Sequence, residues 1–175
     1  MIDLRKAKAD EAGKILKFYH DVIHSIKNSE FKPKWNESYP NLEYIETCIE
    51  KQELYTYTTE HDIIVCIVLN NLFGPESEHI NWKSDATPDE TTIIHTFAVD
   101  SRFAGKGIGK EIFNQIKRNT LKNCQKSIRL DVIDGNVGAE KFFKKLGFEY
   151  VDTVEIFHDA VGLEKFHFYE LVLKN

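Results

Sequence analysis

The sequence predicts an α/β fold, and three observations carry the prediction. Segments with strand-like alternation and segments with helical spacing of apolar residues follow one another in the order β-α-α-β-β-β-α-β-α-β-β. Near the centre of that order, an apolar strand runs through three closely spaced glycines into an amphipathic helix. The 175 residues, 42% hydrophobic and 29% charged, have the size and composition expected of one globular domain over 1–175.

The first third of the chain is expected to form a short strand and two helices. Residues 2–5 alternate as a strand. Asp10 is expected to be the N-cap of a helix whose apolar stripe comprises Ile15, Phe18, Tyr19, Val22, Ile23 and Ile26. The segment 28–41 contains two prolines, which break helices. A second helix is predicted over 42–52, where apolar residues again follow helical spacing.

The middle of the chain is predicted to contain a hairpin, a long insert and a central strand. Strands 54–59 and 63–69 flank a turn at 61–62, which is typical of a hairpin. Residues 70–90 are polar and form a longer connection than an ordinary loop, and such loops tend to be functional or mobile. The run 92–99 is rich in β-branched and aromatic residues, so we expect a buried strand there.

The last third is predicted to add a strand, a helix and two more strands. The strand covers 126–132, and the helix covers 139–146 and ends at Gly147 as its C′ residue. The final strands are expected over 148–157 and 166–173. No internal repeat or low-complexity segment interrupts this order.

The most informative stretch is the glycine-rich turn after strand 92–99. It contains Gly105, Gly107 and Gly109 and leads into a helix that begins near Ile108. Glycine adopts positive φ and has no Cβ, so successive N–H groups at a helix N-terminus can converge on an anion. This chemistry suits a pyrophosphate. A tight turn that binds nothing is the alternative.

Two common nucleotide motifs do not fit this turn. A P-loop needs Gly-Lys followed at once by Ser or Thr, and here Gly107 follows Lys106. A Rossmann turn needs G-x-G-x-x-G early in the chain, whereas these glycines are spaced G-x-G-x-G past its middle.

Two segments together resemble a pair of motifs known from one enzyme family. Residues 99–110 resemble the acyl-CoA-binding motif of the GNAT superfamily of N-acetyltransferases, and 136–148 resemble the segment N-x-x-A-x-x-F-[YF]-x-x-x-G-F that follows it. The resemblance covers about residues 90 to 150, and the rest of the chain agrees in element order. It implies a GNAT fold, with a mixed, mostly antiparallel central sheet flanked by helices.

The resemblance also implies acetyl-CoA as the cofactor and suggests which residues bind it. A strand backbone would pair with the pantetheine arm, the glycine turn would hold the pyrophosphate, and Asn136 would lie near the pantetheine or the thioester. The cofactor-binding candidates are Phe97, Ala98, Val99, Gly105, Lys106, Gly107, Ile108, Gly109, Lys110, Asn136 and Phe143.

The chain departs from the family pattern at two positions. Ala104 stands where the family usually has Arg or Gln before the first glycine, and Arg102 lies two residues too early to replace it. Phe143 stands where many members have a tyrosine that protonates the departing CoA thiolate. Phenylalanine cannot donate a proton, so the general acid stays unassigned.

His95 is the candidate general base. It resembles in position a histidine used by arylalkylamine N-acetyltransferases, and an unperturbed histidine pKa of about 6.5 suits proton transfer near neutrality. Period-two alternation would place Ile93, His95, Phe97 and Val99 on one face of the strand. A histidine satisfied within the core is the alternative.

Three aromatic residues are candidates for acceptor binding. Trp35 and Tyr39 follow the first helix, where GNAT folds build one wall of the acceptor site, although both could instead close the edge of the core. Trp82, with Glu76 and Glu78, could shape a pocket from the long insert, or it could be the single anchor of a solvated loop.

Composition limits the partners and the location. A net charge of −5 argues against nucleic acid, and no apolar stretch or signal sequence indicates a membrane, so we expect a cytoplasmic protein. The chain is expected to be a monomer or a homodimer. The odd, widely spaced Cys48, Cys66 and Cys124 indicate neither a disulfide framework nor a metal site.

The sequence therefore predicts an N-acetyltransferase that passes an acetyl group from acetyl-CoA directly to an amine, on a small molecule or a peptide. One alternative is a transferase for a longer acyl-CoA. The other is a CoA-binding sensor or structural domain with weak catalysis, which the residues at 104 and 143 favour.

Overall fold

The computed structural model describes residues 3–26, 34–60 and 62–174. Contacts divide the chain into two compact units, which are described one at a time. The first unit comprises Met1–Ser29, Trp35–Leu69 and His95–Gln115, and the second comprises Glu30–Lys34, Asn70–Ile94 and Ile116–Asn175. The expectation of a single domain over 1–175 stays a prediction.

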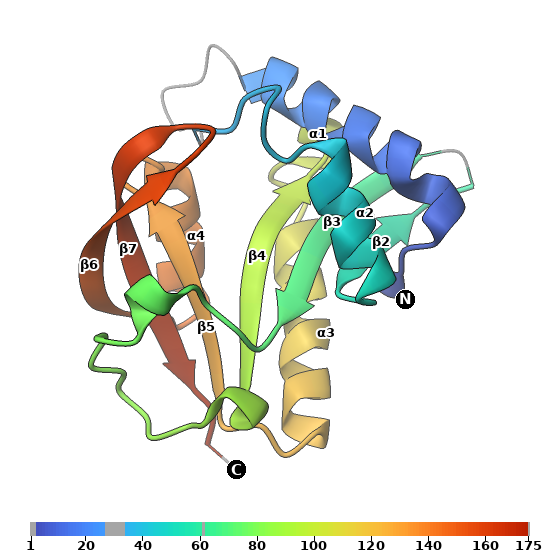
Figure 1. Ribbon diagram of the computed structural model, residues 1–175. Helices are drawn as coiled ribbons and strands as arrows, with labels where there is room; N and C mark the ends of the chain where they lie inside the picture. Colours follow the sequence, from blue (N-terminus) through green and yellow to red (C-terminus); the bar gives the residue numbers. More distant parts are fainter. Residues whose placement is uncertain (1–2, 27–33, 61, 175) are drawn as a thin grey trace. The chain divides into compact units, whose positions relative to one another are not determined.

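The order of the elements agrees with the sequence prediction (Figure 1). Within the described residues the helices and strands are β1 (Arg5–Lys6), α1 (Ala12–Ile26), α2 (Leu42–Glu50), β2 (Leu54–Thr58), β3 (Ile63–Asn70), β4 (Thr91–Val99), α3 (Ile108–Lys122), β5 (Ser127–Ile133), α4 (Val137–Lys145), β6 (Glu149–His158) and β7 (Gly162–Val172). Short 3-10 turns are η1 (Ala9–Glu11), η2 (Pro75–Ser77), η3 (Pro88–Glu90) and η4 (Ser101–Phe103).

The strands form a mixed, mostly antiparallel sheet with the order β1-β2-β3-β4-β5-β7-β6. In the first unit, β1 and β3 each pair antiparallel with β2, which confirms the predicted hairpin. In the second unit, β7 pairs antiparallel with both β5 and β6. The amino-terminal half of β4, Thr91–Ile94, pairs parallel with Ser127–Leu130 of β5. The α/β class and the mixed sheet are thus confirmed.

The first unit has an apolar core between two helices and the sheet. In Figure 1, α1 and α2 cover one face of β2 and β3. The buried side chains are Ala12, Ile15, Phe18, Tyr19, Val22, Ile45, Cys48, Leu54, Cys66, Val68 and Ala98. They include most of the stripe expected on the first helix, which confirms its amphipathic pattern.

The start of the chain differs from the prediction in two details. Among the described residues the first strand is Arg5–Lys6, and Asp3 and Leu4, which were expected in it, lie outside it. Asp10 is not an N-cap, because it lies inside the turn η1 that precedes α1. The neighbouring Glu11 closes that turn: its carboxylate accepts the Lys8 N–H at 2.8 Å and the Arg5 guanidinium at 2.6 and 2.8 Å.

The second unit places helix α4 and the long insert on opposite sides of its strands. In Figure 1, η2 lies in front of β5 and β7, and α4 lies behind them. Consecutive residues of β7 show the same division. The Phe168 ring meets Phe73 of the insert at 5.3 Å, whereas the Tyr169 ring faces the ammonium of Lys144 on α4 at 5.5 Å.

A buried ion pair ties the insert to the sheet. Arg129 Nε donates to Glu170 Oε1 at 2.8 Å, and Ser127 Oγ donates to the same carboxylate at 2.7 Å. From the insert, the backbone N–H groups of Lys83 and Ser84 donate to Glu170 Oε2 at 2.6 and 3.1 Å, and Ser84 Oγ donates to Oε1 at 2.6 Å. These bonds anchor the carboxyl-terminal half of the insert.

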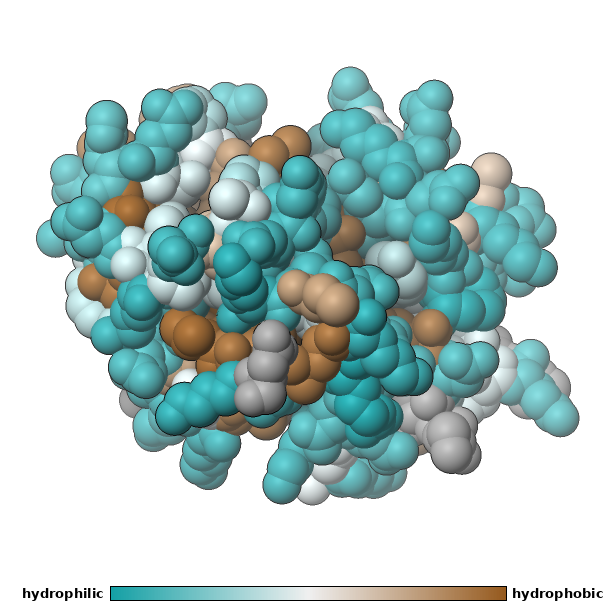
Figure 2. Space-filling view, turned by 90° about the horizontal axis from the view of Figure 1, so that it is seen from below, coloured by the Kyte–Doolittle hydropathy of each residue, from teal (hydrophilic) through white to brown (hydrophobic). Residues whose placement is uncertain are grey.

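One face of the molecule is mainly polar. Figure 2 shows one face covered largely by hydrophilic side chains, with smaller hydrophobic areas between them. Among the described residues, no helix has the length and apolar character needed to cross a membrane.

Candidate functional site

The glycine turn has the backbone geometry expected of an anion site. Gly105 and Gly107 adopt φ of 74° and 81°, and a Cβ built on either would meet no atom within 4 Å. At this end of α3 the Glu111 N–H donates to the Gly107 carbonyl at 3.0 Å. The backbone N–H groups of Ile108, Gly109 and Lys110 lie in the first turn of α3, where N–H groups lack a helical acceptor. They are available to an anion.

The side chains around this turn explain what Arg102 does. Its guanidinium binds Asp100 at 2.6 Å and Asp62 at 3.0 Å, and the hydrogen bond from Arg102 lowers the pKa of Asp100. Arg102 is therefore committed to two carboxylates and does not take the place left by Ala104, which is exposed. Lys106 lies with its ammonium 5.0 Å from the centre of the Phe103 ring.

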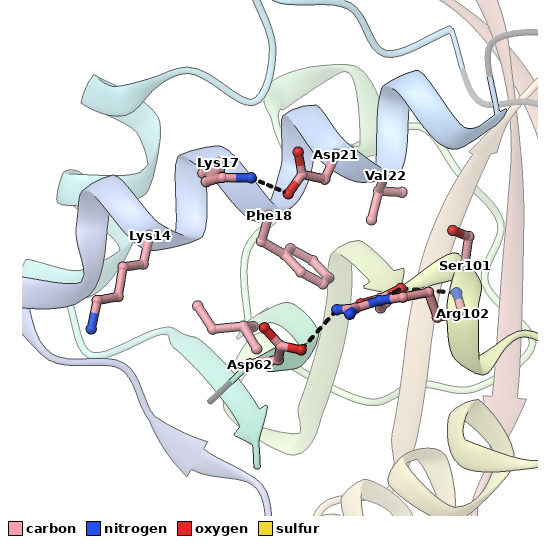
Figure 3. A pocket seen from close by; sticks show the side chains of 10 residues that line it. Lys14, Lys17, Phe18, Asp21, Val22, Asp62, Ser101 and Arg102 are labelled. Atoms are coloured by element: carbon pink, nitrogen blue, oxygen red, sulfur yellow. Dashed lines mark hydrogen bonds and ion pairs between the residues drawn. The ribbon is translucent and has the colours of Figure 1, made fainter. Parts of the chain in front are cut away.

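A cavity of about 600 Å³ lies beside η4 in the first unit (Figure 3). Its lining residues are Lys14, Lys17, Phe18, Asp21, Val22, Asp62, Ile63, Asp100, Ser101 and Arg102. Three cationic and three acidic side chains balance one another, and Figure 3 shows the Lys17–Asp21 and Arg102–Asp62 pairs closed across the lining. Such a balanced lining offers no net positive charge to a pyrophosphate, and the assignment of the glycine turn as the anion site stays a prediction.

Strand β4 is distorted just before the segment expected to bind the cofactor. Thr96 has a φ of 44°, which is rare for a β-branched residue, and its carbonyl accepts the Tyr19 hydroxyl at 2.8 Å. A left-handed residue interrupts the pleat, so the strict alternation expected from Ile93 to Val99 is wrong at Thr96. Backbone strain of this kind concentrates at functional sites.

The acceptor candidates of the first unit gather with other aromatic residues near this distortion. The Trp35 ring packs edge-on against Tyr19 at 5.7 Å, and Tyr39 packs against Tyr44 at 5.1 Å. Burial raises the pKa of Tyr44 far above its usual value, and Tyr39 adds to the rise. Because Tyr19 binds Thr96, this aromatic wall adjoins the strand that carries His95.

The remaining β4 candidates differ in burial. His95, Phe97 and Val99 are half-buried and Ala98 is buried. Ala98 belongs to the core of the first unit. The assignment of His95 as a base and of 97–99 as a pantetheine-binding strand stays a prediction.

Two candidates of the second unit have clear structural roles. Asn136 is the N-cap of α4, and its Oδ1 accepts the Ala139 N–H at 3.3 Å. The Phe143 ring is buried and packs against Phe142 at 5.1 Å and Phe148 at 5.5 Å. Both residues therefore stabilise the helix that follows β5, and their contacts to a cofactor stay predictions.

Trp82 is embedded in the packing of the second unit. Its ring stacks on Phe73 at 5.6 Å and meets Phe168 edge-on at 6.0 Å, and the Arg129 guanidinium lies 4.3 Å from its centre. The ring therefore anchors the insert, which was the alternative to an acceptor contact. A contact between Trp82 and the acceptor stays a prediction. Of the two acids expected beside it, Glu76 is half-buried and Glu78 is exposed.

The sequence interpretation missed Asp131 of β5. Its side chain is half-buried, and its neighbours on the strand, Leu130 and Val132, are buried. Burial raises the pKa of Asp131 to about 6, and Glu76 adds to the rise. The only signal in the sequence was an acid inside the run Leu130-Asp131-Val132. The described residues contain no group of three or more His, Cys, Asp or Glu side chains placed to bind a metal.

Comparisons with known proteins agree with this geometry. The model of the acetyltransferase (GNAT) family matches residues 20–148. An uncharacterised N-acetyltransferase from Methanocaldococcus jannaschii is 33% identical over 96 residues, which are 55% of this chain and 42% of that protein. An acetyltransferase of the GNAT family from Streptococcus agalactiae aligns with 99% of this chain and 96% of its own, at 17% identity and a TM-score of 0.80.

A second solved structure is that of yncA from Salmonella typhimurium with its cofactor acetyl-CoA. It aligns with 100% of this chain and 95% of its own, at 14% identity and a TM-score of 0.67. Both structures share the fold. Because the family model covers most of the chain, the protein belongs to the acetyltransferase (GNAT) family. The chain spans less than half the length of its relative from M. jannaschii.

Proposed function

We propose that the protein is an acetyl-CoA-dependent N-acetyltransferase that transfers an acetyl group directly to an amine. The observation that carries the proposal is the turn from β4 to α3, where two left-handed glycines precede the first-turn amides of a long helix. The family membership and the acetyl-CoA complex of yncA support it.

The residues around the turn fit the cofactor chemically. A pyrophosphate needs several converging N–H donors and close approach of the backbone, and Gly105 to Lys110 offer both. Lys106 and Lys110 add positive charge at the same place. Phe97, Ala98 and Val99 would offer backbone groups to the pantetheine arm, and Asn136 and Phe143 are the other proposed contacts to the cofactor.

The reaction places two demands on this chain's own residues. The amine nitrogen attacks the thioester carbonyl, its proton goes to a base, and the thiolate of CoA leaves. An alkylammonium has a pKa near 10.4, so little free amine exists at neutral pH and a base is needed. His95 is the proposed base, and Trp35, Tyr39 and Trp82 are the proposed acceptor contacts.

Two alternative functions predicted from the sequence can be tested by the same experiment. A longer acyl-CoA could replace acetyl-CoA as the donor. A sensor with weak catalysis is favoured by the exposed Ala104 and by Phe143, whose ring carries no proton to donate. The cytoplasmic location and the monomeric or homodimeric state also stay predictions.

Thermal unfolding and a thiol-release assay test the proposal together. A ligand that binds the folded state at 100 times its Kd stabilises it by about 2.7 kcal/mol, so millimolar acetyl-CoA should raise the Tm. Thiol release with an amine panel should then follow. A Tm shift without release indicates the sensor, release only with longer acyl-CoA indicates the other transferase, and no shift with any acyl-CoA contradicts CoA binding.

A further inference from the structure

We propose that Asp131 determines acceptor specificity by binding the ammonium group of a primary alkylamine, with Glu76 as a second, weaker contributor. The inference rests on the proposed function and deepens it, because it selects acceptors that are cationic when they bind. It is argued from contacts within the second unit alone.

The position of Asp131 follows from the strand registers. Asp131 pairs across the sheet with Phe168 of β7, so both residues lie on the face that the insert covers. The register between β4 and β5 ends at Ile94 and Leu130, one residue before Asp131. Asp131 therefore lies where β5 leaves its parallel partner.

The insert packs two aromatic rings against Phe168, the cross-strand neighbour of Asp131, and brings one acid to the same face. Phe73 and Trp82 both pack against Phe168, at 5.3 and 6.0 Å, and they stack on each other. Glu76 belongs to η2, which lies in front of β5 in Figure 1, and its carboxylate acts electrostatically on Asp131. Aromatic faces beside a carboxylate are a good environment for an organic cation.

The charged groups that share this face leave Asp131 without a counter-ion. Arg129 lies two residues earlier on β5, but it is bound to Glu170 at 2.8 Å and contacts Ser84. Asp152 of β6, which pairs with Phe168, is another acid and accepts the Thr153 N–H at 2.7 Å. Within the described residues, Asp131 has no hydrogen bond or ion pair with another side chain, and no cation compensates the charges of Asp131 and Glu76.

A half-buried carboxylate without a cation is unfavourable for folding, so its presence indicates function. The group would be compensated by a ligand that brings a compact positive charge and an apolar body. An alkylammonium has both, whereas a neutral amine has no charge to offer. At pH 7.5 Asp131 is mostly ionised, since its pKa is about 6, so it is ready to bind a cation.

The direct test measures amine binding by calorimetry, with and without CoA. The panel contains ethylamine, benzylamine, phenethylamine and putrescine as cations and phenylhydrazine as a neutral amine at pH 7.5. The best-bound alkylamine should lose about 10-fold or more in affinity in Asp131→Asn, while phenylhydrazine changes less than 2-fold. Asp85→Asn removes an exposed acid from the same insert and should leave both affinities unchanged.

Two further measurements keep the proposal falsifiable. If Asp131→Asn does not fold, Glu76→Gln should still weaken alkylamine binding several-fold. If it folds, it should unfold at a higher temperature than the wild type at pH 7.5, and this gain should vanish below about pH 3, where Asp131 is protonated in both the folded and the unfolded state.

The outcomes separate this inference from the proposed function. Equal alkylamine affinity in wild type and Asp131→Asn, or no alkylamine binding to the wild type, overturns the inference even if acetyl transfer is found. Alkylamine binding that depends on Asp131 in a protein that never releases CoA thiol retains the inference as a binding site and contradicts the transferase.

Discussion

At the scale of single residues, the candidate site combines strained backbone with polar groups in apolar surroundings. Thr96 holds a left-handed φ of 44° in the middle of a strand, supported by a hydrogen bond from Tyr19. The residue before it, His95, is half-buried and is the proposed general base. The distortion and the histidine therefore occupy one short stretch of β4.

Replacing His95 by alanine tests its role as the base. We expect kcat/KM for the acceptor to fall on the order of 100-fold, because general-base catalysis contributes about that much, while acetyl-CoA affinity changes little. The pH profile of kcat/KM should lose the limb assigned to the histidine.

A matched control is His79→Ala, which removes an exposed histidine of the insert and should leave the rate unchanged. If His95→Ala keeps both the rate and the pH profile, His95 is a core residue. The base must then be sought among the acidic and aromatic side chains of 34–41 and 70–90.

At the scale of elements, two devices organise the protein: the turn from β4 to α3, and the insert held on the sheet of the second unit. The turn depends on backbone conformations that glycine alone adopts at little cost. The insert depends on a buried carboxylate that collects five hydrogen-bonding groups, given by Ser84, Ser127, Arg129 and the Lys83 N–H, with Ser84 contributing twice. A substitution in the turn and a substitution in the anchor of the insert are expected to have different effects.

Gly107→Val should abolish the thermal shift caused by acetyl-CoA. The φ of 81° is strained for a β-branched residue, and the new side chain would occupy the open space over the backbone. Gly13→Ala is the matched control, since Gly13 lies on α1 with no atom within 4 Å of an added Cβ. That control should gain about 0.5–1 kcal/mol of stability and keep the shift. An unaltered shift in Gly107→Val would place the phosphate elsewhere.

Glu170→Gln should destabilise the protein by about 3–5 kcal/mol, because it leaves Arg129 buried without its partner. Burial alone would raise the pKa of Glu170, but the hydrogen bonds from Ser127, Ser84 and Arg129 prevail and lower it. The wild-type advantage is therefore complete above the unfolded-state pKa of about 4.3 and is lost as pH falls through the lower folded-state pKa. Urea unfolding of both proteins at several pH values measures it. A constant difference down to pH 2 would contradict this account.

At the scale of the whole molecule, the chain forms two compact units that share elements. β4 and α3 each begin in one unit and end in the other. A strand or helix cannot melt in one half without losing hydrogen bonds at the boundary, so the units are expected to unfold together.

Calorimetry tests this expectation and, with it, the single domain predicted from the sequence. We expect one transition whose calorimetric and van't Hoff enthalpies agree. Two resolved transitions, or a calorimetric enthalpy well above the van't Hoff value, would show that the units are separate domains. A saturating dose of acetyl-CoA should move the single transition as a whole.

The sequence by itself determined the order of the elements and the location of the glycine turn. Both follow from local rules: apolar periodicity separates strands from helices, and closely spaced glycines after a strand permit positive φ before a helix. The same local patterns carried the resemblance to the GNAT family, which the match over residues 20–148 confirmed.

The tertiary structure decided features that depend on partners far apart in the chain. The distortion at Thr96 is supported by Tyr19, 77 residues earlier, and Trp82 of the insert packs against Phe168 of β7 and Arg129 of β5. Asp131 looked like an ordinary acid in a strand, because only the folded chain shows that burial and the charge of Glu76 both raise its pKa. Burial and pairing are properties of the assembled chain, and no pattern within a single segment contains them.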